Sequence, residues 1–118
     1  FGPWEAEWGR AAARLLLNDG AAFDAVICQN DVLARGCIEE LERNGCRVPQ
    51  DVAVIRHDNS PDYVSYAHPL LTSIDDNNEM LGRQAALCLL DAIAGHPHHG
   101  VERVPVKLIQ RESTLPLD

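Results

Sequence analysis

The sequence predicts an α/β fold in which the strands of one parallel sheet alternate with helices that cover both of its faces. Short apolar runs of strand length, such as AVIC at residues 25–28 and VAVI at residues 52–55, alternate with longer stretches of helical periodicity. Such alternation implies right-handed crossovers that join parallel strands, in a doubly wound layout. A length of 118 residues allows one such core and not two.

The first helix is expected to begin after Pro3 and to end near Gly20. Its predicted apolar stripe consists of Trp4, Trp8, Ala11, Ala12, Leu15 and Leu16. From their spacing, core packing of the two tryptophans is favoured over a ligand-binding platform. The AVIC run that follows is expected to be a strand buried on both faces of the sheet.

Two further helices are expected, and each has start and stop signals. The second begins with Asp31 as its N-cap and ends at Gly45. The third is the clearest, because Asp76 and Glu79 have the spacing of a capping box. Its predicted apolar stripe consists of Leu81, Ala85, Cys88, Leu89, Ala92 and Ile93, and Gly95 closes the helix.

The remaining elements are short. VAVI and LLTSI, the latter at residues 70–74, are expected to be strands, with a single helical turn in the SPDYVSYAHP segment between them. A last strand is expected over roughly residues 104–109, and Pro105 places at least that end at a sheet edge.

Charge and cysteine content narrow the class of protein. Ten basic against eighteen acidic residues give a net charge of −8, which disfavours direct binding of DNA or RNA. No apolar run approaches the roughly 18 residues that a membrane span needs. The four cysteines, at positions 28, 37, 46 and 88, lack C-x-x-C spacing and are expected to be reduced thiols of a cytoplasmic protein. The opening FGPWEAEWG has no signal peptide and suggests an internal piece of a longer chain.

Polar side chains follow the first two predicted strands. Asn30 and Asp31 come directly after the first, and His57, Asp58 and Asn59 come after the second. Ligands of parallel α/β sheets bind at the carboxyl ends of the strands, so these residues are candidates for a small-molecule site. Carboxylate and amide groups suit the hydroxyls of a sugar or polyol.

Structural roles for the same residues remain open. Asp31 is better explained as the cap of its helix, which leaves Asn30 as the better ligand candidate. Asp58 and Asn59 could equally shape a turn before Ser60.

Catalytic and metal-binding patterns are weak. His57 and Asp58 are the one acid–base pair to consider, but neighbouring residues of a strand point to opposite faces. The GHPHHG segment carries His96, His98 and His99, and a solvated loop is favoured there because no acidic or thiol partner is evident nearby. We therefore assign no catalytic residue, no metal and no cofactor, and we expect a binding protein and not an enzyme.

The order of four segments resembles the effector-binding domain of the lactose-repressor (LacI/GalR) family of bacterial transcription regulators. These segments are DAVICQNDVLARG, NGCRVPQDVAVIRHDNSP, HPLLTSIDDNNEMLGRQAALCLLDAI and VKLIQREST. The likeness covers essentially the whole chain, and the combination of ND, VP-x-DVAVI, P-L-x-T and RES-T is specific.

The resemblance implies a three-layer α/β/α, periplasmic-binding-protein-like fold of type I, with a ligand cleft between two lobes. This chain would be an incomplete carboxyl-terminal lobe, formed by residues 1–75 and about 107–118. Residues 76–106, approximately, would belong to the amino-terminal lobe, and the DNA-binding headpiece would be absent. A related alternative is a periplasmic sugar-binding protein of a transport system.

The resemblance also implies a set of contacts with a sugar or sugar derivative that changes the affinity for operator DNA. Those effector-binding positions are Trp4, Asn30, Asp58, Asp76 and Asn78. Because the family dimerises near the SPDYVSYAHP segment, Tyr63 and Tyr66 are expected at the interface of a homodimer.

Two departures from the family pattern bear on the effector. Arg56-His57-Asp58-Asn59 stands where the family usually has Gly-aromatic-Asp-Asp, and Asp76 stands where a neutral polar residue is common. A bulkier and more basic pocket floor is therefore expected, together with an effector that carries both a basic and an anionic or amino group.

Overall fold

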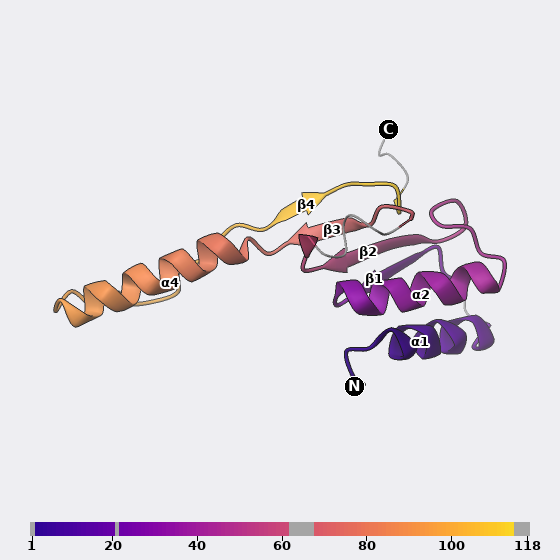
Figure 1. Cartoon of the computed structure of the whole chain (residues 1–118), viewed down its shortest axis with the longest axis horizontal. Coiled ribbons are helices and arrows are strands. Elements are labelled where there is room, and N and C mark those ends of the chain that lie inside the picture. Colours follow the sequence, from indigo (N-terminus) through magenta and orange to yellow (C-terminus); the bar gives the residue numbers. More distant parts are fainter. Residues whose placement is uncertain (1, 21, 62–67, 115–118) are drawn as a thin grey trace.

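The computed structural model describes residues 2–20, 22–61 and 68–114 and contains one sheet with three helices (Figure 1). In chain order the elements are α1 Ala6–Asn18, β1 Ala25–Cys28, α2 Asp31–Arg43, β2 Ala53–His57, β3 Thr72–Asp75, α4 Asn78–Ile93 and β4 Lys107–Ile109. The predicted helices and strands are thus confirmed, with shifted ends and a shorter last strand. The predicted turn in SPDYVSYAHP lies mostly outside the described residues.

The four strands lie in the order β1-β2-β3-β4. β1 and β2 pair in parallel, as do β2 and β3, which confirms the predicted crossovers. β4 pairs antiparallel with β3, so the expectation of an all-parallel sheet was wrong for this strand. The physical reason is that the chain leaves β3 into α4 and then turns straight back, which reverses its direction (Figure 1).

Helices α1 and α2 lie on the same side of the sheet, and α2 packs directly on β1 and β2 (Figure 1). Val26 and Cys28 of β1 point toward these helices, whereas Ile27 points away and is 70% exposed. Within the described residues no helix covers that second face. Neither helices on both faces nor a β1 buried on both faces is therefore observed.

The two helices of this layer approach each other through glycines. A Cβ built on Gly36 of α2 would overlap the backbone of Ala6, and a Cβ on Gly9 of α1 would overlap the carbonyl of Leu33. The buried residues of α1 are accordingly Gly9 and Ala13. The predicted stripe of larger side chains was wrong as a core face: Trp4, which precedes the helix, is 68% exposed.

Ion pairs flank this close contact. Arg10 of α1 reaches Glu39 of α2 with an Nη1–Oε2 distance of 2.7 Å, and Arg14 reaches Glu40 with an Nε–Oε1 distance of 3.0 Å. The hydrogen bonds to these arginines and to Arg35 hold the pKa values of both glutamates below their ordinary range. The ion pairs therefore join α1 to α2 where the backbones are closest.

The helix starts differ from the predictions. Asn30, not Asp31, is the N-cap of α2, and its Oδ1 accepts a hydrogen bond of 2.8 Å from the Leu33 amide. At α4 the capping box is absent: the N-cap is Asn77, in the left-handed conformation with φ of 54°, and it makes no side-chain cap bond. Asp75 accepts the Asn77 amide hydrogen bond at 2.9 Å and so stabilises this turn.

The RES-T segment, residues 111–114, joins β2 to β3 through hydrogen bonds of Ser113. Ser113 is fully buried; its hydroxyl donates to the Val54 carbonyl at 2.6 Å and accepts from the Thr72 amide at 2.8 Å. The Ser113 backbone bonds the Val54 amide and the Leu70 carbonyl as well. One serine thus fills the gap between β2 and the start of β3.

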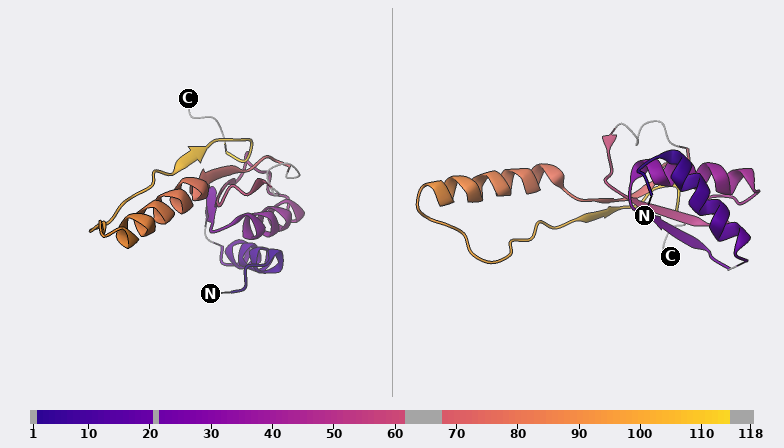
Figure 2. Two further views of the ribbon diagram at one scale, coloured as in Figure 1. Left: turned by 60° about the vertical axis from the view of Figure 1, so that its left-hand side comes forward. Right: turned by 90° about the horizontal axis from the view of Figure 1, so that it is seen from below.

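Helix α4 projects from the rest of the molecule as an arm (Figures 1 and 2). None of its residues is buried, and the exposed large apolar ones are Met80, Leu81, Leu87, Leu89, Leu90 and Ile93. The radius of gyration is 17.9 Å, whereas a compact domain of this length has about 13–14 Å. The arm therefore exposes an apolar surface that the rest of the described chain does not cover. No described helix has both the length and the apolar character needed to cross a membrane.

Candidate functional site at the carboxyl edge of the sheet

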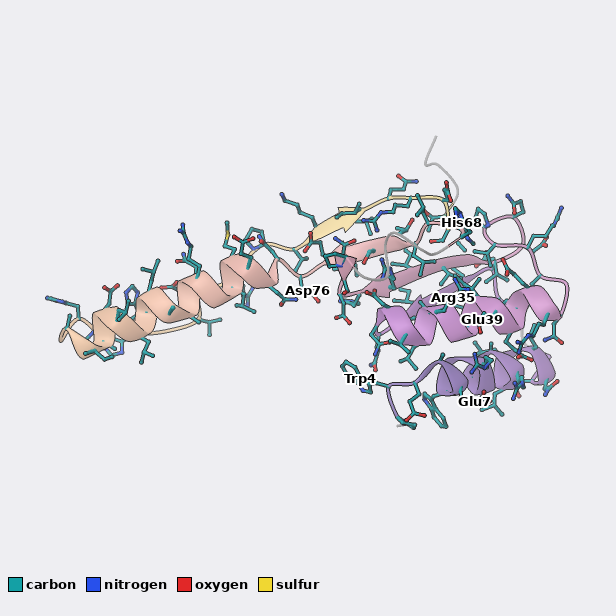
Figure 3. All side chains as sticks on the ribbon, in the orientation of Figure 1. Trp4, Glu7, Arg35, Glu39, His68 and Asp76 are labelled. Carbon is teal, nitrogen blue, oxygen red and sulfur yellow. The ribbon has the colours of Figure 1, made fainter. Side chains whose placement is uncertain are left out.

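The predicted site lies where β1, β2 and β3 end. The three strands are parallel, so their last residues, Cys28, His57 and Asp75, lie at the same edge of the sheet. The polar residues that follow the strands gather at that edge. Figure 3 shows the labelled Asp76 at this edge, just before the arm.

Asn30 is at this edge but is not open to solvent. It is 3% exposed, and the helix cap already uses its Oδ1. What remains for a ligand is the amide nitrogen, which makes no hydrogen bond within the described residues. Asn30 therefore has a structural role that the sequence had given to Asp31.

Asp31 forms a buried ion pair with Arg56 and accepts a hydrogen bond of 2.9 Å from the Ser60 amide. Arg56 lies on the helix-covered face of β2, fully buried, and its Nε and Nη2 have no hydrogen-bond partner within the described residues. Burial raises the pKa of Asp31, while the Arg56 charge opposes that rise. The Arg56 guanidinium is thus neutralised inside the fold and does not make the pocket floor basic, contrary to expectation.

Asp58 and Asn59 both have positive φ, 88° and 53° respectively. Asp and Asn tolerate the left-handed region better than other side chains, although each such residue still costs on the order of 1 kcal/mol or more. The turn interpretation is therefore correct for the backbone. The Asp58 carboxylate makes no hydrogen bond or ion pair within the described residues, which leaves it available at the rim.

His57 does not pair with its neighbour Asp58 but with Asp76, across the β2–β3 pair. The Nδ1–Oδ1 distance is 3.4 Å, and the two side chains are 41% and 31% exposed. The sequence gave no sign of this contact, because it depends on the register that places His57 beside Ile74.

Asn59 links two charged residues that the sequence analysis did not select. Its Nδ2 donates to Asp75 Oδ2 at 3.4 Å, and its Oδ1 accepts from Arg111 Nη2 at 2.7 Å. Arg111 also donates to the Leu71 carbonyl, and burial followed by the Arg56 charge lowers its pKa. The strand-end rule would have found Asp75, but Arg111 arrives from a segment 52 residues away in sequence.

The other predicted positions are not joined to this network. Asn78 is exposed in the first turn of α4, and Trp4 is exposed beside α1 (Figure 3). Tyr63 and Tyr66 lie outside the described residues.

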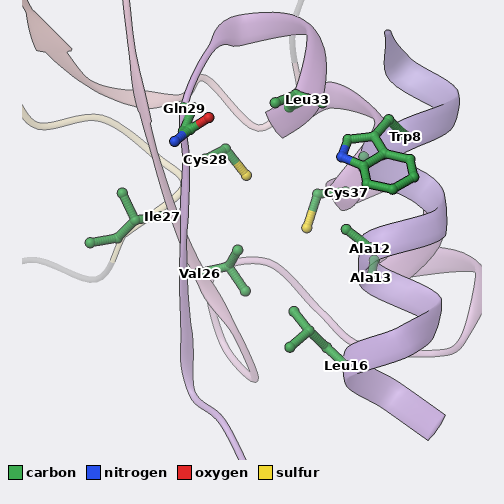
Figure 4. Close-up of a pocket in the computed structure, with 11 residues that line it drawn as sticks. Trp8, Ala12, Ala13, Leu16, Val26, Ile27, Cys28, Gln29, Leu33 and Cys37 are labelled. Atoms are coloured by element: carbon green, nitrogen blue, oxygen red, sulfur yellow. The ribbon is translucent and has the colours of Figure 1, made fainter. Parts of the chain in front are cut away.

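A separate apolar cavity of about 250 Å³ lies between α1, β1 and α2 (Figure 4). Trp8 and Leu16 of α1 line it, together with the buried thiols of Cys28 on β1 and Cys37 on α2. The hydrogen bond to Cys37, together with burial, raises the pKa of Cys28. All four cysteines are free, as expected of reduced thiols. The cavity holds no charged side chain and is a gap in the helix packing.

Comparison with known proteins identifies the fold. Residues 3–114 match the model of the periplasmic binding protein-like domain family. The chain belongs to that family. The predicted resemblance to lactose-repressor-type regulators is confirmed as well. Over 114 residues the chain is 35% identical to the HTH-type transcriptional regulator CelR of Thermobifida fusca, and it covers 33% of that protein. Over 117 residues it is 36% identical to the repressor CytR of Escherichia coli, covering 34% of it.

Solved structures agree with the sequence comparison. The lac repressor bound to ONPG superposes with a TM-score of 0.87 at 31% identity, over 96% of this chain and 34% of the other. The CelR–cellobiose complex gives 0.81 at 35% identity, over 95% and 34%. A dimeric lac repressor gives 0.87 at 31% identity, over 99% and 43%. This chain thus spans about a third of the length of these two curated relatives, both of which are transcription regulators.

Proposed function

We propose that this domain is the effector-sensing part of a bacterial DNA-binding transcriptional regulator. In this proposal a small sugar-like molecule binds at the carboxyl edge of the sheet and changes the affinity for operator DNA. The observation that carries it is the Asp58 carboxylate, which has no partner among the described residues and lies at an edge that also holds His57, Asn59 and Asp76. The solved relatives of the family include a cellobiose complex.

We assign DNA binding to a separate headpiece because the 118 residues of this chain carry a net charge of −8, which repels the phosphate backbone. A regulator of this kind acts in the cytoplasm, where operator DNA is, and four free thiols are compatible with that location.

The charges at the edge favour an effector with hydroxyl or amino groups. Asp58, Asp75 and Asp76 outnumber the cationic candidates His57 and Arg111, and Arg111 is engaged with Asn59. A carboxylate accepts two hydroxyl hydrogens or pairs with an ammonium group. We therefore propose an amino sugar ahead of a plain hexose, and a sugar acid or phosphosugar last.

Signal transmission in this proposal runs through the arm. The chain leaves the sheet after Asp75, and the arm begins at Asp76. Closure of a second lobe on the effector would therefore move α4 relative to the carboxyl edge of the sheet. Because a ligand shifts an equilibrium only by its preference for one state, the effector must contact both sides of that hinge. Asp76 and Asn78, at the base of the arm, are the residues proposed to do so.

We also propose a homodimer or a swapped assembly. The described residues leave the apolar side chains of α4 uncovered, and one of the similar solved structures is a dimeric lac repressor. Tyr63 and Tyr66 are proposed as a second contact. Light scattering at high concentration tests this, and a clean monomer would contradict it.

The binding proposal is tested by isothermal titration of the complete gene product, and of the 118-residue chain beside it. The panel contains a neutral hexose, cellobiose, an amino sugar, a sugar acid and a phosphosugar. We expect the amino sugar to bind most tightly. Tight binding of the plain hexose, with no gain for the amino sugar, would overturn the charge argument.

The matched variants are Asp58→Asn and Asp24→Asn. Asparagine tolerates the positive φ at position 58, so the first variant removes the charge and leaves the turn intact. A hydrogen bond to a charged group contributes about 1.5–3 kcal/mol, so affinity should fall about 10- to 100-fold. Asp24 precedes β1 at the opposite edge of the sheet, and its variant should bind as the wild type does.

Operator binding tests the regulatory half of the proposal. The complete gene product should retard a DNA fragment from its own promoter region, and the effector identified by titration should change the concentration needed. Effector binding without any DNA binding would instead support a periplasmic sugar-binding protein.

A further inference from the structure

The outer half of the arm carries a cluster of metal-ligating side chains that the proposed effector site does not use. Helix α4 ends at Ile93, Gly95 follows at φ of 88°, and the His96 amide donates back to the Asp91 carbonyl at 2.9 Å. This left-handed C-cap reverses the chain. The segment after the helix therefore brings His98 and Glu102 back against Cys88 and Asp91.

The contacts of His98 define the centre of the cluster. Its Nε2 lies 2.7 Å from Asp91 Oδ2, and its Nδ1 lies 3.0 Å from Glu102 Oε1. The other oxygen of Glu102, Oε2, lies 3.7 Å from the sulfur of Cys88. One ligand atom each from Cys88, His98 and Glu102 lies within 4.8 Å of the other two.

These separations are close to those of a zinc shell. Zinc bonds of about 2.0–2.3 Å in tetrahedral geometry place the ligand atoms roughly 3.3–3.6 Å from one another. The observed 3.0 and 3.7 Å lie on either side of that interval but reach different oxygens of Glu102, and the three ligand atoms as a set lie within 4.8 Å of one another. The side chains must therefore move closer together to form a metal shell. Thiolate, imidazole and carboxylate are also the three ligand types that zinc takes in proteins.

Asp91 has the position of an orienting partner. A carboxylate that accepts a hydrogen bond from one ring nitrogen fixes the histidine tautomer and leaves the lone pair on the other nitrogen. With Asp91 at Nε2, Nδ1 is the ring nitrogen left for a metal ion, which would displace the Nδ1 hydrogen that Glu102 otherwise accepts.

A solvated ion pair would explain why His98 lies between the carboxylates of Asp91 and Glu102, but it would not explain the position of the Cys88 thiol. Cys88 is the one residue of α4 that is not exposed, and its sulfur is turned to Glu102.

We propose that Cys88, His98 and Glu102 bind a divalent transition-metal ion of the zinc type, with water in the fourth position and Asp91 orienting the histidine. The ion would tie the returning segment to α4 and so stiffen the arm. The four side chains come from two turns of α4 and from the GHPHHG segment and the residues just after it, for which the sequence alone had shown no thiol or acidic partner.

The test is a titration of the 118-residue chain with zinc against a chromophoric zinc indicator, and with cobalt followed by absorption. We expect one ion per chain. Cobalt should give a near-ultraviolet thiolate charge-transfer band together with visible bands of tetrahedral intensity, because the site contains one sulfur and three lighter ligands.

The variants are Cys88→Ser, His98→Asn and Glu102→Gln, with Asp91→Asn as the orienting variant. Loss of an outer partner costs about 10- to 100-fold in affinity, so Asp91→Asn should fall in that range and the ligand variants should exceed it. Matched controls are Cys46→Ser and His96→Asn, a free thiol and a histidine outside the cluster, and both should bind as the wild type does. Circular dichroism checks that each variant is folded.

Three results would overturn the site. One is the absence of saturable zinc binding in the wild type. A second is a cobalt–thiolate band that persists in Cys88→Ser. The third is a loss in His96→Asn as large as in His98→Asn, which would indicate chelation by the loop histidines alone.

Discussion

Replacement of Gly36 by alanine tests the packing of α1 on α2 most directly. An added Cβ at this position would overlap the carbonyl oxygen, carbonyl carbon and Cα of Ala6. These are backbone atoms, so no side-chain rotation relieves the clash and α1 must shift. The ion pair between Arg10 and Glu39 resists such a shift because it joins the same two helices.

Two opposing effects set the magnitude. Alanine in a helix interior is favoured over glycine by about 1 kcal/mol. Overpacking a close-packed contact costs about 1–3 kcal/mol, and an obstacle made of backbone places the cost in the upper part of that range. The expected net destabilisation is about 1–2 kcal/mol, or a fall in Tm of at least about 4 °C.

Urea unfolding followed by circular dichroism gives the free energy, and Gly82→Ala is the matched control. Gly82 lies in α4, where an added Cβ would meet no atom within 4 Å. That variant should raise helix content and leave the core transition unchanged. A Gly36→Ala chain as stable as the wild type, or more stable, would refute the close approach of α1 and α2.

Three further predictions concern stability. Asp31→Asn should cost about 3–5 kcal/mol in urea unfolding because it leaves Arg56 charged, buried and unpaired, and a loss below about 1 kcal/mol would contradict the buried ion pair. Ser113→Ala should cost about 1–3 kcal/mol by removing both hydroxyl hydrogen bonds between the strands, with Ser60→Ala, whose described contact is through its backbone, as the control. The folded pKa values of Glu39 and Glu40 lie below their ordinary value of 4.5, so their stabilisation is present above about pH 4.5 and is lost as the pH falls through the lower folded values. Thermal unfolding between about pH 6 and pH 3 should show this loss in the wild type and less of it in Glu39→Gln, and an equal loss in both would contradict the linkage.

The candidate site at the carboxyl edge of the sheet was only partly predictable from sequence. Asn30 and Asp58 follow from one local rule, since apolar runs of strand length show where parallel strands end and hence where polar residues gather. Their individual roles did not follow. The cap of α2 belongs to Asn30 because Asp31 is drawn to Arg56, and that pairing depends on the register of β1 with β2.

Contacts between distant segments were out of reach of the sequence. Arg111 joins Asn59, His57 joins Asp76, and Glu102 reaches Cys88 only after the chain has reversed at Gly95. Periodicity likewise suggested a stripe of large side chains on α1, whereas the glycines at positions 9 and 36 decided which face is buried.

The sequence by itself thus determined the kinds of element, their order, the sheet edge at which polar residues gather and the family to which the domain belongs. These depend on local periodicity, strand ends and residue patterns along the chain. The tertiary structure alone decided the antiparallel β4, the open face of the sheet, the neutralised Arg56 and the exposed arm. Each of these depends on which surfaces meet, and that is settled by register and backbone approach between segments far apart in sequence.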